Sequence, residues 1–109
     1  METKPDRLRE TLEGYVVDIA CLRTTPVTRI GEAARVHSTA CALMGHCIES
    51  GYGLVDDNGK ITLLDPKATK HVIEALVKTS KEKGARLRVE REGKAGEMET
   101  VSVREAVDR

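Results

Sequence analysis

Apolar and polar positions alternate in the first regular stretch of the chain. Tyr15 and Val17 share one face of an extended backbone, and the β-branched residues around them favour a strand that ends near Cys21. Residues 1–11 are charged and have no sustained periodicity. We therefore expect a flexible N-terminal arm over residues 1–11, followed by a single domain over residues 12–109.

The next pattern is compatible with a helix. Residues 22–31 mix Pro, Thr and Gly and indicate a loop, whereas residues 32–44 (EAARVHSTACALM) are rich in Ala. Several glycines follow, so we expect this helix to end between Met44 and Ser50.

A hairpin and a second helix come next. Asn-Gly at residues 58–59, between the apolar runs 52–55 and 60–64, is typical of a tight hairpin turn. Asp-Pro at residues 65–66 then favours the start of a helix, with a side-chain oxygen of Asp65 capping its first amides. One face of this helix should be buried, because apolar residues recur at helical spacing, and Gly84 is the expected stop. The apolar residues are Val72, Ile73, Leu76 and Val77.

Two final stretches, residues 85–92 and 98–107, alternate apolar and polar positions and predict half-exposed strands. The predicted fold class is α+β. It is a small five-stranded OB-like β-barrel, with one helix between strands 3 and 4 and a Cys/His-bearing helix between strands 1 and 2.

Composition narrows the functions that this domain can have. Its 109 residues suit one core, and 18 basic and 18 acidic residues give a formal net charge of zero. No overall field draws such a chain to nucleic acid or to an anionic membrane. Two tyrosines are the only aromatic residues, so the stacking platform that single-strand binding uses is missing. We expect neither nucleic-acid binding nor membrane insertion.

The expected compartment follows from the same sequence. No apolar run approaches the roughly 20 residues of a membrane span, and the opening METKPDRLRE lacks the apolar centre of a signal peptide. We expect a cytoplasmic protein as the sequence is written, and a periplasmic or secreted one if a signal peptide has been removed. Export would favour a disulfide, and a reducing compartment would favour free or metal-bound thiols.

Four stretches together resemble a known family. They are GYVVDIAC (residues 14–21), HSTACALMGHCIESGYGLV (residues 37–55), DNGKITLLD (residues 57–65) and RLRVEREGKAGEMETVSV (residues 86–103). They are similar to small bacterial OB-like barrels of largely uncharacterised function, which often carry an H-x3-C-A-L-M-x2-C-x2-S-G-Y-G core. The resemblance implies an OB-like fold and brings no settled activity. Many proteins of that family are exported, whereas this sequence shows no signal peptide.

The cysteine and histidine residues suggest a metal site. Cys21, His37, Cys41 and Cys47 form the kind of Cys3His set that tetrahedral zinc accepts. On one helix, His37 and Cys41 are four residues apart and share a face. Cys47 would point away from that face unless the helix breaks near Gly45.

Other side chains offer alternatives near this set. His37, Cys41 and Met44 fall on one helical stripe, which would suit Cu(I) or would simply pack as core. His46 is a reserve ligand. Asp18 would either orient a ligand histidine or cap the nearby loop.

From these residues we predict a small metal-binding domain that binds zinc, or a soft metal such as copper, in a structural or metal-handling role. The alternative is a redox-responsive or disulfide-stapled interaction domain without metal. Cys41 and His37 have the spacing of a nucleophile and its base, but no orienting third residue or oxyanion motif accompanies them. An enzyme is therefore the less expected outcome, and the metal ion is the expected partner.

Overall fold

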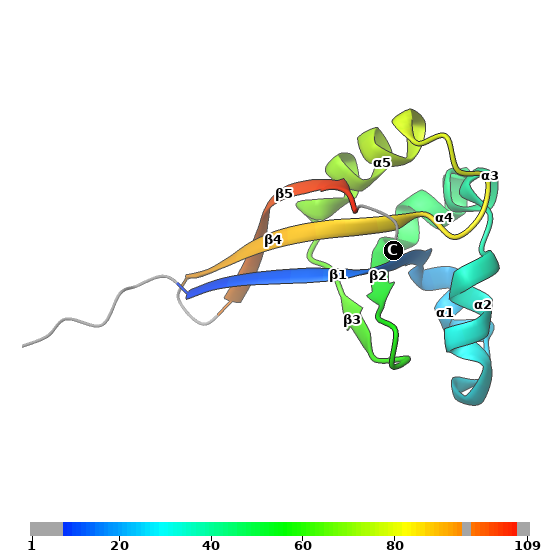
Figure 1. Ribbon diagram of the computed structural model, residues 1–109. Coiled ribbons are helices and arrows are strands. Elements are labelled where there is room, and N and C mark those ends of the chain that lie inside the picture. Colours follow the sequence, from blue (N-terminus) through cyan, green and yellow to red (C-terminus); the bar gives the residue numbers. More distant parts are fainter. Residues whose placement is uncertain (1–7, 95–96, 107–109) are drawn as a thin grey trace, which may run out of the picture.

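Five antiparallel strands form one sheet with the order β3-β2-β1-β4-β5 (Figure 1). The computed structural model describes residues 8–94 and 97–106, and the architecture is α+β, as predicted. The strands are β1 (Leu8–Asp18), β2 (Tyr52–Val55), β3 (Ile61–Leu63), β4 (Arg86–Lys94) and β5 (Glu97–Glu105). The helices are α1 (Ile19–Thr24), the 3₁₀ helix η1 (Val27–Arg29), α2 (Ile30–Val36), α3 (Thr39–Ala42), α4 (Gly45–Ser50) and α5 (Ala68–Lys78).

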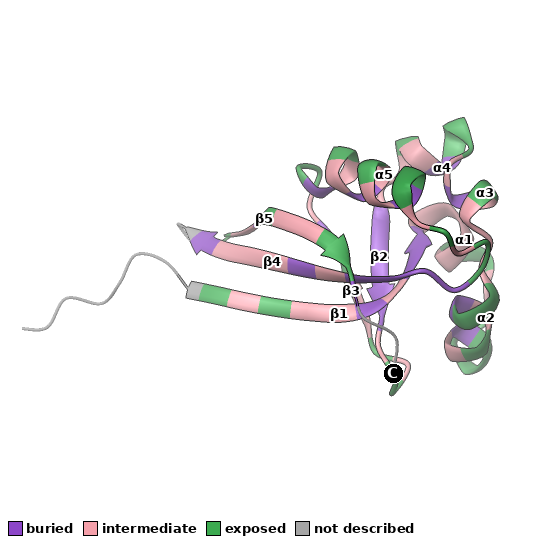
Figure 2. Cartoon of the chain, turned by 45° about the horizontal axis from the view of Figure 1, so that its top comes forward, coloured by how far each residue is buried: buried purple, intermediate pink, exposed green. Residues whose placement is uncertain are grey.

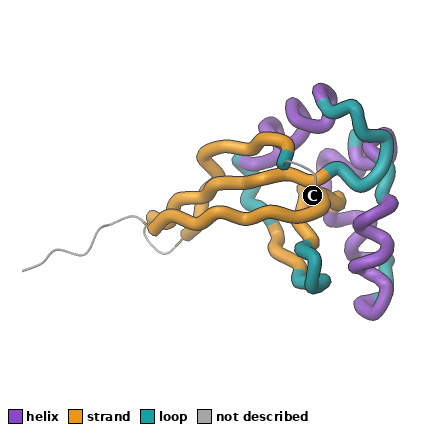
Figure 3. The backbone as a smooth tube through the Cα atoms, in the orientation of Figure 1, coloured by secondary structure: helices purple, strands orange, loops and turns teal. Residues whose placement is uncertain are grey.

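The sheet is not closed into a barrel, which corrects the OB-like architecture predicted from the sequence. Strands β3 and β5 are its two edges, and β3 is only three residues long. Strand β1 pairs with β2 only over Tyr15–Asp18, whereas its earlier residues pair with β4 alone. The long strands therefore extend away from the helices, which gather at one end of them (Figure 3).

The charged start of the chain is partly strand. Residues 8–11, which we placed in a flexible arm, belong to β1 and pair with β4 in the register Leu8↔Gly93. Glu10 and Arg91 form an ion pair across these strands, with 2.6 Å between Oε1 and Nη2. Charged residues on a paired ribbon look like a solvated arm in the sequence, because neither face carries a continuous apolar row. Residues 1–7 lie outside the described residues.

The main core lies between the sheet and α5. Val72 and Leu76, one turn apart on α5, belong to the same buried cluster as Leu87 and Val89 of β4. Tyr52 of β2 is also in this cluster, and buried residues run along all of β2 (Figure 2). The periodicity of α5 thus reflects one buried face, as the sequence indicated. None of the helices in the described ranges has the length and apolar character needed to cross a membrane.

The hairpin between β2 and β3 is confirmed. The two strands pair antiparallel, and the Asp56 side chain accepts hydrogen bonds from the amides of Asn58 and Lys60 in the turn. Gly59 adopts a φ of 83°, a conformation that glycine enters without steric cost.

Asp65 connects the start of α5 to β5. Its carboxylate accepts hydrogen bonds from the Thr100 amide at 3.0 Å and from the Thr100 hydroxyl at 2.6 Å. Burial alone would raise the pKa of Asp65, but the hydrogen bonds from Thr100 outweigh it and hold the pKa below its ordinary value. The Asp65 side chain, which we expected to cap α5, binds β5 instead, and α5 begins at Ala68 without a side-chain cap hydrogen bond.

We expect the substitution Asp65→Asn to lower the free energy of unfolding by about 1–3 kcal/mol at pH 7. A lowered folded-state pKa means that the contribution is complete above the unfolded pKa of about 3.9 and is lost as the pH falls through the folded value. Urea unfolding at pH 7 and near pH 3 measures this. The exposed Glu97→Gln is the control. An Asp65→Asn variant as stable as the parent at pH 7 would contradict the assignment.

Candidate metal centre

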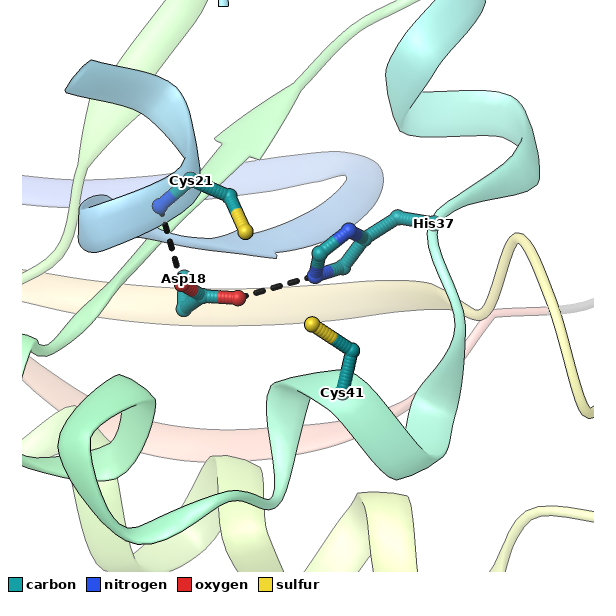
Figure 4. Close-up of side chains that lie close together, drawn as sticks. All are labelled: Asp18, Cys21, His37 and Cys41. Carbon is teal, nitrogen blue, oxygen red and sulfur yellow. Dashed lines mark hydrogen bonds and ion pairs between the residues drawn. The ribbon is translucent and has the colours of Figure 1, made fainter. Parts of the chain in front are cut away.

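Four potential ligands from four neighbouring elements meet at the helical end of the sheet (Figure 4). One ligand atom from each lies within 4.8 Å of the others. The residues are Asp18 at the end of β1, Cys21 in α1, His37 after α2 and Cys41 in α3. The sulfur atoms of the two cysteines point toward the Asp18–His37 pair (Figure 4).

Asp18 ends β1 and starts α1. Its backbone is extended, and its Oδ2 accepts a hydrogen bond of 2.9 Å from the amide of Cys21. This N-cap replaces the strand end and loop that we predicted around Cys21, because a capped first turn satisfies the amides that a strand would leave unpaired here. Cys21 is consequently held three residues beyond the carboxylate.

The prediction of one continuous helix over residues 32–44 is wrong. Helix α2 ends at Val36, His37 is extended, and Ser38 caps α3 by accepting a hydrogen bond of 2.9 Å from the amide of Cys41. The His37 carbonyl accepts a hydrogen bond from the Gly84 amide, which holds the bend. His37 and Cys41 therefore meet across a break in the chain and not along one helix face.

The two cysteines occupy equivalent local positions. Cys21 follows Asp18, and Cys41 follows Ser38, by three residues, and each cysteine amide donates to the side chain of its capping residue. Sequence reasoning missed this pattern, although D-x-x-C and S-x-x-C are both visible. Two short helices thus present their first turns to the same point.

Asp18 is a buried carboxylate with its oxygens occupied. It is 0% exposed, and its Oδ1 lies 2.8 Å from the Nε2 of His37. Burial on its own would raise the pKa of Asp18. The Cys21 amide, the Cys47 thiol and His37 lower it further than burial raises it, so the net pKa lies below the ordinary value. Both contacts that we considered for Asp18, to a histidine and to a backbone amide, are present.

Two thiols near this carboxylate, Cys21 and Cys47, have raised pKa values. Burial first, and then the negative charge of Asp18, raise the pKa of Cys21 to about 12. Burial first, and then a hydrogen bond with Asp18 and its charge, raise the pKa of Cys47 to about 11. Both are therefore protonated at neutral pH, whereas a nucleophilic cysteine requires a thiolate. A bound cation reverses this preference, since it attracts the thiolate and the carboxylate alike.

The remaining predicted residues lie beside the group. Cys47 in α4 is 1% exposed and neighbours Asp18 and Cys41, but its sulfur is outside the set of atoms within 4.8 Å. His46 is exposed, and its Nε2 lies 3.5 Å from the Cys47 sulfur. Met44 is 50% exposed, and the continuous helix that would align it with the ligands is absent. All three cysteines are free.

The donor set is compatible with a tetrahedral ion. Zinc binds Cys, His and Asp at about 2.0–2.3 Å, which places ligand atoms about 3.3–3.8 Å apart. The four atoms already lie within 4.8 Å, and Cys21, His37 and Cys41 are partly exposed, so an ion can reach them from solvent. The shorter separation between Asp18 and His37 is that of a hydrogen bond, whose hydrogen an ion would replace.

Comparison with known proteins adds no family. No family model, curated protein or solved structure matches the chain. The resemblance to small OB-like barrels stays a prediction, and the geometry of the site is what bears on function.

The support of the His37 bend provides a test. Gly84 has a φ of 64°, and a Cβ there would overlap the carbonyl oxygen of Arg35. We expect Gly84→Ala to lower the free energy of unfolding by more than about 1 kcal/mol. It should also weaken metal binding, because the segment between α2 and α3 that carries His37 must shift.

Gly45→Ala is the matched control, since a Cβ at Gly45 meets nothing within 4 Å. Urea unfolding and zinc titration of both variants are the measurements. Equal stability and equal zinc affinity for the two would show that Gly84 does not position His37.

Proposed function

We propose that this protein is a small metal-binding domain in which Asp18, Cys21, His37 and Cys41 bind one zinc ion. The observation that supports the proposal best is the convergence of four ligand-type side chains within 4.8 Å around a fully buried carboxylate. A buried charge is costly unless it is compensated, and a divalent cation compensates it directly.

The chemistry of the four donors favours zinc over harder ions. Two thiols and an imidazole are the ligands that zinc accepts in structural sites, and calcium or magnesium would require oxygen donors. The carboxylate supplies one oxygen and a negative charge. Two thiolates and the carboxylate carry three negative charges, so the site with a divalent ion has a net charge of about −1. Solvent reaches the site at His37, whose side chain is 12% exposed, and can stabilise that charge.

The ion would have a structural or metal-handling role. Helix α1 has six residues and none of them is buried, and α3 has only four. Helices of this length have little stability of their own. An ion held by both of them and by β1 would fix them to the sheet, and any ion that binds only the folded state adds to its stability.

The substitution Cys41→Ser tests the site. We expect the parent protein to bind one zinc ion and Cys41→Ser to lose at least about tenfold in affinity, because a hydroxyl is a much weaker zinc ligand than a thiolate. Native mass spectrometry and elemental analysis of the folded proteins give the stoichiometry. The control is His46→Ala, which removes an exposed imidazole outside the four-residue group. Unchanged zinc binding by Cys41→Ser would refute the proposal.

A redox-responsive interaction domain is the second candidate. It is favoured by one observation, the proximity of the free Cys21 and Cys41 sulfurs within the same 4.8 Å group. Oxidation would join them at about 2.05 Å and occupy two ligands at once. In the mass spectrum of the protein as isolated, a loss of two hydrogens without added metal supports this candidate, and an added metal mass with free thiols supports the first.

A further inference from the structure

The metal centre has one more donor than a tetrahedral ion needs. Cys47 lies in α4, which packs against α1, α3 and β1, and it is buried beside Asp18 and Cys41. The first turn of α1 is bound to the same helix, because the Ser50 hydroxyl accepts from the Ala20 amide at 3.0 Å and donates to the Cys47 carbonyl at 2.7 Å. A third thiol is therefore held at the inner side of the site.

The three thiols are neighbours at the site. Cys41 is close enough to both other thiols to raise the pKa of Cys21 and that of Cys47. Cys21 and Cys41 are thus common to two overlapping sets of donors. One set adds the oxygen of Asp18 and the nitrogen of His37, and the other adds the sulfur of Cys47.

We propose, building on the zinc site above, that Cys21, Cys41 and Cys47 form a second ligand set that binds a soft monovalent ion, Cu(I), in place of zinc. Thiolates are the preferred ligands of Cu(I), whereas a carboxylate oxygen is a hard donor that it avoids. The Asp18–His37 hydrogen bond of 2.8 Å stays intact in this second set, because neither residue coordinates the ion. The same site would then bind zinc and Cu(I) through different sets of side chains.

The occupancy of the two sets follows from their geometry. Zinc uses the four atoms that already lie within 4.8 Å and displaces the hydrogen between Asp18 and His37. Cu(I) requires that the sulfur of Cys47, which lies outside the four-atom group, move toward Cys41. A trigonal site with three sulfurs needs no further protein ligand.

X-ray absorption of the wild-type protein tests the proposal directly. The protein is loaded with zinc alone or with Cu(I) alone, under anaerobic conditions with a reductant present. We expect about two sulfurs and two lighter N/O atoms around zinc, and about three sulfurs around Cu(I). Two sulfurs with N/O donors around Cu(I) would overturn the second ligand set.

Two variants give the complementary test. We expect Cys47→Ser to bind Cu(I) at least about 100-fold more weakly, because losing a direct ligand costs more than losing an outer-shell partner. Its zinc affinity should change by less than about tenfold. His37→Ala should weaken zinc binding strongly and leave the Cu(I) affinity nearly unchanged. Equal losses for both metals in Cys47→Ser would show that Cys47 only supports the fold, and would also refute the proposal.

The two proposals fail separately. A protein that binds no zinc but binds Cu(I) through three sulfurs refutes the zinc site alone. A protein that binds zinc with two sulfurs and binds Cu(I) with the same donors refutes the second set alone. If Cys47→Ser does not fold, the absorption measurement on the wild-type protein still decides.

Discussion

The rest of the site depends on a carboxylate that has been removed entirely from water. A buried charge without partners would be strongly destabilising, and Asp18 resolves this by accepting hydrogen bonds from the Cys21 amide and by pairing with His37. Its first bond caps the start of α1, and its second orients the imidazole of His37. Asp18 therefore joins the first turn of α1 to the His37 imidazole.

The same charge governs the chemistry of its surroundings. Without a cation, burial and then Asp18 disfavour thiolates at Cys21 and Cys47 by raising the pKa of each thiol. With a cation present, the carboxylate and the thiolates act together.

Local signals predicted much of the fold, and long-range pairing limited the rest. The hairpin at Asn58-Gly59 and the buried face of α5 follow from turn chemistry and helical periodicity. The prediction of one helix over residues 32–44 was wrong because it relied on the high Ala content. The Ser38 cap and the hydrogen bond between Gly84 and His37 interrupt the helix there. Barrel closure could not be judged from single strands, since it depends on whether the edges β3 and β5 reach each other.

The donor types were visible in the sequence, but their grouping was not. Cys21, His37 and Cys41 were expected to meet, and the structure places them together for a different local reason than a shared helix face. Asp18 was expected beside the ligands and lies within the group itself. Asp18 accepts from both of the partners that we considered, and its complete burial, which places it within the group, is not readable from one strand.

A crystal structure of the zinc-loaded protein, with anomalous data at the zinc edge, tests the central claim most directly. The account expects one peak among Asp18, Cys21, His37 and Cys41, at about 2.0–2.3 Å from each, and a separation between Asp18 Oδ1 and His37 Nε2 longer than the present 2.8 Å. A peak at another site, or no peak with that hydrogen bond unchanged, would contradict it.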